Sequence, residues 1–213
     1  MKAVLIDHGA GNVVSVEKAL RHAGLALERA KTPEGLTTPD VLVLPGQGHF
    51  GQVMEAFKNS GFEPLVREHL AADRPFLGIC VGLQILLDGS EEAPGVPGLG
   101  VFPGTVRRFQ STHDSIPHMG WNEVKHDGRS ALLAGLPSPF HAYFAHSYYV
   151  PTSDVLKTAA TTTYAGAEFA SILEKGRLTA TQFHPEKSQE AGLRLLKNFV
   201  NQAVAHRPQP ELT

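Results

Sequence analysis

The chain has 213 residues, of which 42% are hydrophobic and 19% charged, and its formal net charge is −2 at pH 7. This length suits one domain of the larger kind, so residues 1–213 are expected to form a single domain. A charge so near zero lacks the basic surface that binds nucleic acid or an anionic membrane. No apolar run approaches the roughly 18 residues of a membrane helix, and a single cysteine cannot form an internal disulfide. We therefore expect a soluble protein of the cytoplasm.

The first half of the sequence alternates short apolar runs with helical patterns. A strand at 3–7 precedes a glycine-rich turn and a helix with Val13, Val16, Leu20 and Ala23 at helical spacing. Further elements are expected in this order: strands at 25–30 and 40–45, a helix at 62–73, a buried strand at 75–80 and a helix over 82–88. This alternation predicts an α/β fold with a largely parallel central sheet flanked by helices.

The second half has a different character, because strand-like runs follow one another with little helix between them. These runs lie at 106–110, 121–125, 143–150, 156–164 and 178–185. They predict an antiparallel extension of the sheet. Helical periodicity returns over 189–205, where the following apolar residues share one face: Leu193, Leu196, Phe199, Val200 and Ala203. Residues 206–213 are expected to be a polar tail.

Cys80 is the only cysteine, and glycines stand two positions away on both sides of it, at Gly78 and Gly82. This pattern, between a buried strand and a helix, is that of a nucleophile elbow with cysteine in the place of serine. A sharp turn leaves no room for side chains at the flanking positions, and the positive end of the following helix favours the reactive thiolate. A lone cysteine is otherwise most often a small buried apolar side chain.

The segment "QFHPEKS" at 182–188 supplies a candidate base for the thiol. His184 stands at the end of a predicted strand, and the alternation of a strand would put Glu186 on the same face. With Pro185 fixing the backbone, the carboxylate could hold one imidazole nitrogen while the other nitrogen faces the sulfur. The spacing by itself is a weak signal, since surface pairs show it by chance.

Taken together, these segments resemble the class I, triad-type glutamine amidotransferases, and within them the glutaminase subunits of imidazole glycerol phosphate synthase. The resemblance runs through nearly the whole chain in order: "GAGNVVSV" (9–16), "LPGQGHF" (44–50), "GICVGLQ" (78–84), "SEEAPGVPGLG" (90–100), "PHMGWN" (117–122), "YFAHSYY" (143–149) and "FHPEKS" (183–188). The elbow and "HPE" belong to the wider family, whereas "PHMGWN" and "HPEKS" are more specific to this branch. The resemblance implies a flavodoxin-like sheet.

The resemblance also implies a reaction that needs no cofactor and no metal. Cys80 would attack the side-chain carboxamide of glutamine, His184 would shuttle the proton and Glu186 would orient the imidazole. Ammonia leaves, and water then releases glutamate from the thioester. The matching positions for the oxyanion donors and for binding the amino-acid end of glutamine are Gly46, Gln47, Gly48, Val81, Gln84, Ser147 and Tyr148. The N–H groups of Gln47 and Val81 would be the oxyanion donors, and Gly46 could take a positive φ and let the Gly46–Gln47 peptide rotate.

The partner implied by the resemblance is a cyclase subunit with a (β/α)8 barrel, bound as a heterodimer. It would use the ammonia to make imidazole glycerol phosphate and aminoimidazole carboxamide ribotide in histidine biosynthesis. The positions that would face the barrel are Asn12, Trp121, Tyr143 and Lys187. Each has an ordinary alternative, namely a helix cap for Asn12, core aromatics for Trp121 and Tyr143, and a solvated charge for Lys187.

Three other interpretations fit parts of the sequence. "GAGNVV" with Glu28 further on resembles a dinucleotide-binding fingerprint, but Val14 replaces the third glycine and Glu28 lies inside its strand pattern. The histidines could suggest a metal site, but His113, His118 and His126 have no carboxylate at helical spacing to them, so no ligand cluster stands out. The third alternative is a stand-alone γ-glutamyl hydrolase of the same fold, against which the "PHMGWN" and "HPEKS" segments argue.

Overall fold

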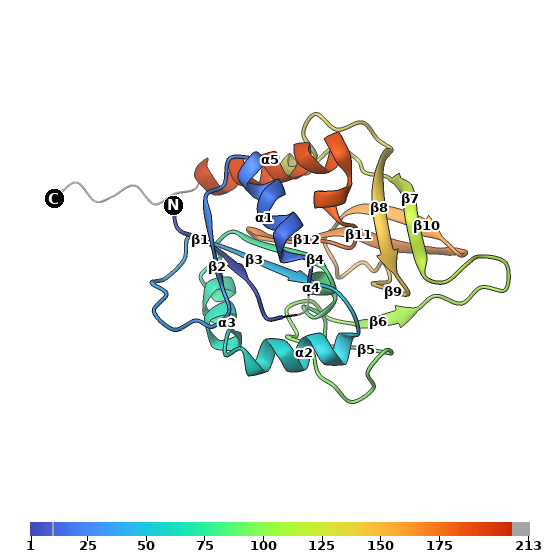
Figure 1. Cartoon of the computed structure of the whole chain (residues 1–213). Helices are drawn as coiled ribbons and strands as arrows, with labels where there is room; N and C mark the ends of the chain where they lie inside the picture. The colour runs from blue at the N-terminus through green and yellow to red at the C-terminus, as the bar shows by residue number, and fades with distance from the viewer. Residues whose placement is uncertain (10, 206–213) are drawn as a thin grey trace.

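The computed structural model describes residues 1–9 and 11–205, so the predicted tail at 206–213 lies outside the described residues. A seven-stranded sheet has the order β10-β11-β12-β4-β3-β1-β2 (Figure 1). Its parallel strands are β1 (Ala3–Ile6), β2 (Leu27–Ala30), β3 (Val41–Gly46), β4 (Phe76–Cys80) and β12 (Leu178–Thr181). The antiparallel strands are β10 (Thr158–Tyr164) and β11 (Ala167–Lys175). The predicted α/β fold with its antiparallel extension is confirmed.

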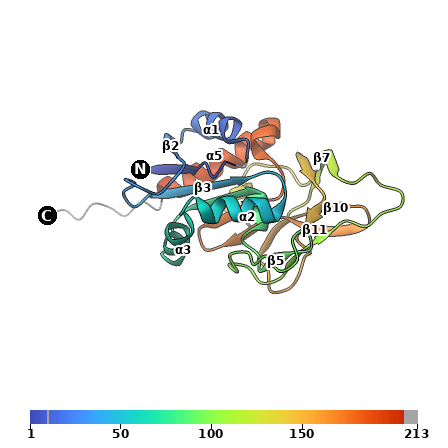
Figure 2. The ribbon, with the colours of Figure 1, turned by 60° about the horizontal axis from the view of Figure 1, so that its bottom comes forward.

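Helices cover both faces of this sheet. On one face lie α1 (Val13–His22) and α5 (Gln189–Ala205), and on the other lie α2 (Phe50–Asn59) and α3 (Glu63–Ala71) (Figures 1 and 2). Because β1, β3 and β4 are covered on both faces, they are apolar throughout, and Val41–Leu44 of β3 are completely buried. In the described part of the chain, no helix combines the length and apolar character needed to cross a membrane.

Smaller sheets stand beside the carboxyl ends of the central strands. β7 (His118–Val124) pairs with β8 (Phe140–His146) in antiparallel register, and β6 (Thr105–Arg108) lies between β5 (Gly89–Ser90) and β9 (Tyr148–Tyr149). The expected strand at 143–150 is thus divided at Ser147 between β8 and β9. The short helices η1 (Ala131–Leu133) and η2 (Pro185–Lys187) are 3-10 helices.

Two of the longer elements, α2 and β11, were not predicted from the sequence. β11 has six consecutive buried residues, Phe169–Glu174, because it lies inside the sheet, and it therefore lacks the alternation that marks a strand with one exposed face. The start of α2 is stabilised by groups that are not a standard cap. His49 Nδ1 accepts from the Gly51 N–H, and the Glu92 carboxylate, distant in sequence, accepts from the Phe50 N–H at 2.7 Å.

The helix expected over 82–88 is wrong in extent, because α4 covers only Val81–Gln84. Backbone N–H groups of residues 98–102 bind the carbonyls that a longer helix would use. Leu99 N–H donates to the Ile85 carbonyl, and the N–H groups of Val101 and Phe102 both donate to the Leu86 carbonyl. Those carbonyls are therefore unavailable to a further helical turn, and the apolar run 85–87 is buried against this segment.

We predict that Gly98→Ala will destabilise the protein by about 1–3 kcal/mol, because an added Cβ would meet the Leu87 carbonyl oxygen and lie 3.0 Å from that of Ile85. Urea unfolding measures this. Gly89→Ala is the matched control, since its nearest neighbour would be the Val96 carbonyl at an ordinary 3.6 Å. Equal stability of the two variants would contradict this account of why α4 is short.

Candidate active site

Cys80 ends β4 in a backbone conformation that side chains rarely adopt, with φ 56° and ψ −112°. The chain turns so sharply that glycine is required around it. A Cβ on Gly78 would stand 2.9 Å from the Gly82 carbonyl oxygen, and one on Gly82 would overlap the Leu44 carbonyl oxygen. Strained backbone of this kind, over-determined by its surroundings, is typical of functional sites. The helix that follows, α4, is a single turn. Its dipole therefore stabilises a thiolate at Cys80 less than the longer predicted helix would.

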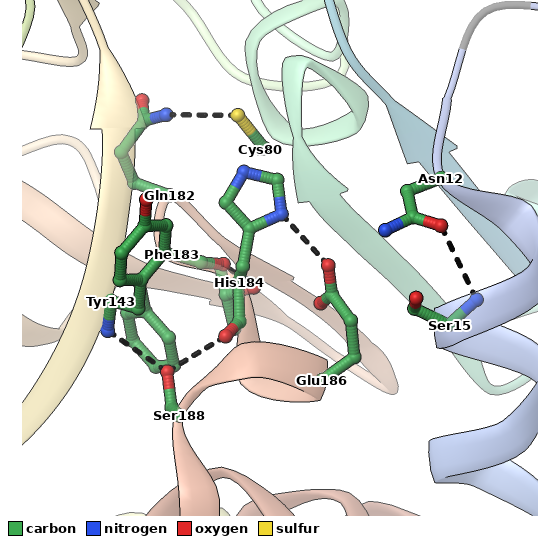
Figure 3. Close-up of polar contacts among 10 residues, drawn as sticks. Asn12, Ser15, Cys80, Tyr143, Gln182, Phe183, His184, Glu186 and Ser188 are labelled. Atoms are coloured by element: carbon green, nitrogen blue, oxygen red, sulfur yellow. Dashed lines mark hydrogen bonds and ion pairs between the residues drawn. The ribbon is translucent and has the colours of Figure 1, made fainter. Parts of the chain in front are cut away.

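His184 and Glu186 form a buried pair beside this turn. His184 Nδ1 lies 2.9 Å from Glu186 Oε1, and the two side chains are only 4% and 1% exposed (Figure 3). We expected His184 and Glu186 to share one face of a strand, but β12 already ends at Thr181. The 3-10 turn η2 brings the Glu186 carboxylate to the His184 ring instead.

The other ring nitrogen of His184, Nε2, is buried, faces Cys80 and has no hydrogen bond of standard geometry (Figure 3). Burial alone lowers the pKa of His184. The charge of the Cys80 thiolate and its contact with the ring, followed by the hydrogen bond and charge of Glu186, outweigh burial and raise this pKa to about 10. The raised pKa favours an imidazolium facing the Cys80 sulfur, so a proton donor lies beside a candidate nucleophile.

The backbone of His184 is tied to β8. Its N–H donates to the Tyr143 carbonyl at 2.9 Å, while Ser188 Oγ accepts from the Tyr143 N–H at 3.0 Å and donates to the His184 carbonyl at 2.7 Å (Figure 3). Tyr143 is one of the residues predicted to face a partner. A shift of β8 at this point would therefore move the imidazole directly.

The segment predicted to supply an oxyanion donor lies at the same edge of the sheet. Gly46 ends β3 and pairs with Cys80, and Val81 follows Cys80 as the first residue of α4. Gly46 does not have a positive φ in this structure, whereas Gly48 has a φ of 106°. The close approach of the backbones requires glycine at position 46, because a Cβ there would lie 2.6 Å from the Gly82 nitrogen. Gln47 and Gly48 are exposed.

The residues expected to hold the amino-acid end of glutamine are brought together, but some of their polar groups already have protein partners. The Tyr148 carbonyl accepts from Gln84 Nε2 at 2.9 Å, and the Ser147 carbonyl accepts from the Phe109 N–H at 3.1 Å. Gln84 Nε2 also donates to Gln182 Oε1 at 3.1 Å. The Oε1 atom of Gln84 has no hydrogen bond with the described residues, which leaves an acceptor for an ammonium group.

Sequence reasoning missed Gln182, although it stands at the start of the quoted "QFHPEKS". Its side chain is completely buried, and its Nε2 donates to Cys80 Sγ at 3.8 Å, a long contact for sulfur (Figure 3). The signal was available in the alternation of the strand. Residue 182 stands two positions before His184, so an extended backbone directs both side chains to one side.

Three of the four predicted partner residues form a cluster at the surface. Trp121 and Tyr143 are register partners of β7 and β8 with ring centroids 6.1 Å apart, and Lys187 Nζ lies 5.6 Å from the centroid of Tyr143. Trp121 is 48% exposed, which excludes a core role. Asn12 lies apart from Tyr143 (Figure 3). Its Oδ1 accepts from the Ser15 N–H at 3.4 Å, which makes it the cap of α1 (Figure 3).

Other expectations concerned metals and nucleotides. Within residues 1–9 and 11–205, no group of three or more His, Cys, Asp or Glu side chains gathers as metal ligands would. His113 is exposed, His126 is partly buried and His118 is buried. Glu28 lies in the interior of β2 opposite Val4 and not at the end of its strand, where a dinucleotide ribose would be bound.

Comparisons with known proteins agree with this geometry. The family model "Glutamine amidotransferase class-I" matches residues 4–203. The chain is 52% identical to "Imidazole glycerol phosphate synthase subunit HisH" of Thermus thermophilus, covering 92% of this chain and 95% of that one. The protein of the same name from Deinococcus radiodurans is 50% identical, with coverages of 93% and 92%.

Solved structures share the fold at lower identity. A "glutamine amidotransferase" crystal structure superposes with a TM-score of 0.73 at 20% identity and covers 94% of this chain and 98% of its own. A putative GMP synthase protein from Thermoplasma acidophilum gives a TM-score of 0.72 at 21% identity, with coverages of 97% and 96%. The chain therefore belongs to the class I glutamine amidotransferase family. Within that family it groups with the HisH subunits of imidazole glycerol phosphate synthase.

We predict that Glu186→Gln will flatten the pH dependence of stability between pH 6.5 and about 10. A pKa raised from 6.5 to about 10 means that protonated His184 contributes stability in full below pH 6.5, and that this contribution is lost as the pH rises through the folded value. Removing the carboxylate lowers the folded pKa and so shrinks the loss. Urea unfolding at several pH values measures the slope, and an unchanged slope would refute the contribution of Glu186.

Proposed function

We propose that this chain hydrolyses glutamine to glutamate and ammonia at Cys80 and passes the ammonia to a synthase subunit, with Cys80, His184 and Glu186 as its catalytic residues. The observation that carries the proposal is the buried Glu186–His184 pair, whose free ring nitrogen faces a thiol held on a strained elbow. The HisH relatives support the synthase as the destination of the ammonia.

The chemistry follows from the groups in place. The Cys80 thiolate attacks the carboxamide carbon of glutamine, and the C–N bond breaks as the His184 imidazolium gives its proton to the departing nitrogen, which leaves as ammonia. The neutral imidazole then takes a proton from water, whose oxygen attacks the thioester and releases glutamate and the thiolate. Glu186 holds the ring with Nε2 towards the sulfur in both steps. Each cycle consumes one glutamine and one water.

The tetrahedral intermediates need donors for their negative oxygen. The N–H groups of Val81 and Gln47 are the proposed pair, because both residues adjoin the contact of Gly46 with Cys80. The Oε1 atom of Gln84 accepts from the α-ammonium of glutamine. The segment 46–48, in which Gln47 and Gly48 are exposed, is proposed to rotate between states with the N–H turned towards or away from the oxygen, and a loaded partner stabilises the active state.

The proposed partner is a cyclase subunit with a (β/α)8 barrel that forms imidazole glycerol phosphate and aminoimidazole carboxamide ribotide in the cytoplasm. Ammonia released into water is mostly protonated at neutral pH and is then not a nucleophile, so direct transfer preserves its reactivity. The half-exposed cluster of Trp121, Tyr143 and Lys187 is the proposed contact, and Asn12 is proposed to face the same partner while capping α1. The HisH relatives disfavour the alternative of a stand-alone γ-glutamyl hydrolase.

The first test replaces the nucleophile. Cys80→Ala should abolish glutamine hydrolysis in the complex with a nucleotide-loaded cyclase subunit. The variant should bind that subunit normally, because alanine accepts this backbone about as well as cysteine does. Glutamate release and partner affinity are the measurements. Hydrolysis that persists without the thiol would end the proposal, as would a wild-type complex that releases no glutamate.

A second test concerns the oxyanion donor. Gln47→Pro deletes the N–H and should lower the partner-stimulated turnover about 10² to 10³-fold, the usual effect of losing one such donor. Gln47→Ala, which keeps the N–H, is the matched control and should retain most activity. Thermal stability and partner affinity of both variants are measured alongside. Full stimulated turnover in a folded, partner-bound proline variant would show that this N–H is not used.

A further inference from the structure

Two buried histidines outside the triad face each other across the β7–β8 pair. His118 and His146 are register partners, are 3% and 6% exposed, and have Nδ1 of His118 3.1 Å from Nε2 of His146. Burial lowers the pKa of His118 to about 4 and that of His146 to about 3. Both rings are therefore neutral at physiological pH, so each has one donor and one acceptor nitrogen.

The directions of the hydrogen bonds follow from one group that can only accept, the Tyr148 carbonyl. His146 Nδ1 lies 2.7 Å from this oxygen and must donate to it. Nε2 of the neutral ring is then an acceptor, so His118 Nδ1 donates to it. That leaves Nε2 of His118 to accept from the Asn122 amide at 3.2 Å. Every polar atom in this series is satisfied, and both histidines must be the Nδ1–H tautomer.

The same carbonyl fixes a second series that ends at the nucleophile. Because Tyr148 accepts, Gln84 Nε2 donates to it, and its second hydrogen points to Gln182 Oε1. The remaining amide group of Gln182, Nε2, donates to Cys80 Sγ. One continuous hydrogen-bond chain thus joins Asn122 to the sulfur. Its members in order are Asn122, His118, His146, the Tyr148 carbonyl, Gln84, Gln182 and Cys80.

The packing around the rings keeps the chain in place. His118 stacks between Tyr164 and Phe144, with centroid distances of 3.9 and 4.7 Å. Phe169 meets His146 edge-on at 5.3 Å. Aromatic side chains would fill these positions without any polar group, so packing alone does not account for two imidazoles. The hydrogen bonds do.

We propose that His118 and His146 are positioning residues for the glutaminase reaction: through the Tyr148 carbonyl they orient the amides of Gln84 and Gln182, and so align bound glutamine with the Cys80 sulfur. This inference rests on the proposed function. His146 fixes the carbonyl, the carbonyl fixes which end of Gln84 faces the substrate, and Gln182 supplies the thiolate with a donor. His118 fixes the tautomer of His146.

The test compares two variants of His146 in the full chain bound to the cyclase subunit. His146→Phe keeps the aromatic packing and loses the donor to Tyr148, and it should raise the KM for glutamine about tenfold, as expected for a buried carbonyl that loses a partner. His146→Asn places its amide nitrogen where Nδ1 stood and should restore a KM within about threefold of the wild type. Iodoacetamide alkylation of Cys80, the only thiol, should slow about threefold or more in the phenylalanine variant alone.

A matched control separates this role from stability. His69 is 2% exposed and its Nε2 lies 2.9 Å from the Pro75 carbonyl, so it has the same kind of bond at the opposite end of β4. Both His69→Phe and His146→Phe should lower thermal stability. His69→Phe, however, should leave the KM and the alkylation rate unchanged. If both phenylalanine variants change KM equally, or if His146→Asn is no better than His146→Phe, the positioning role is wrong.

A second measurement is independent of glutamine hydrolysis. Nitrogen NMR of the imidazoles, assigned with the variants, should show the Nδ1–H tautomer for both His118 and His146 in the wild type. An Nε2–H tautomer at either residue would overturn the hydrogen-bond chain. A wild-type complex that does not hydrolyse glutamine would instead refute the proposed function. The tautomers and the alkylation rates would still show whether the hydrogen-bond chain exists.

Discussion

The backbones of β3 and of the turn after β4 touch without any side chain between them, and the active site depends on this contact. A Cβ on Gly46 would lie 2.6 Å from the Gly82 nitrogen, and a Cβ on Gly82 would overlap the Leu44 carbonyl. The turn can therefore fold back over the sheet, which forces Cys80 into its positive φ. The same contact sets the proposed oxyanion segment beside the sulfur, so one steric condition places two parts of the chemistry.

Strand order completes the site. β3, β4 and β12 are adjacent and parallel, so their carboxyl ends bring the proposed oxyanion segment, Cys80 and the segment that leads to His184 to one edge. Gly46 and Cys80 are the last residues of β3 and β4, so the sheet itself holds them. The half-exposed cluster at Trp121 is tied to this edge at two points, by the bond between Tyr143 and His184 and by the bonds that begin at Asn122. Binding at that surface therefore has direct physical routes to the sulfur and to the imidazole.

The sequence revealed the parts of the site that depend on local geometry. Glycines at fixed distances from Cys80 and the spacing of His184 and Glu186 are local, and the strand-helix alternation of the first half predicted the sheet. What escaped prediction depends on groups distant in the chain. α2 is capped by Glu92, and α4 ends early because 98–102 takes its carbonyls. The contacts of Gln182 with Cys80 and of His146 with His118 form only on folding, although the position of Gln182 two residues before His184 was a local signal.

The place of β12 in the sheet has a consequence for how the protein is made. β12 lies between β4 and β11, yet it is among the last elements in the sequence, whereas Cys80 stands in the first half. During synthesis the thiol therefore emerges from the ribosome long before the histidine that completes the site. A nascent or interrupted chain that lacks β12 has the proposed nucleophile with no base beside it. By the proposed mechanism such fragments release no ammonia, so they consume no glutamine until translation has passed His184.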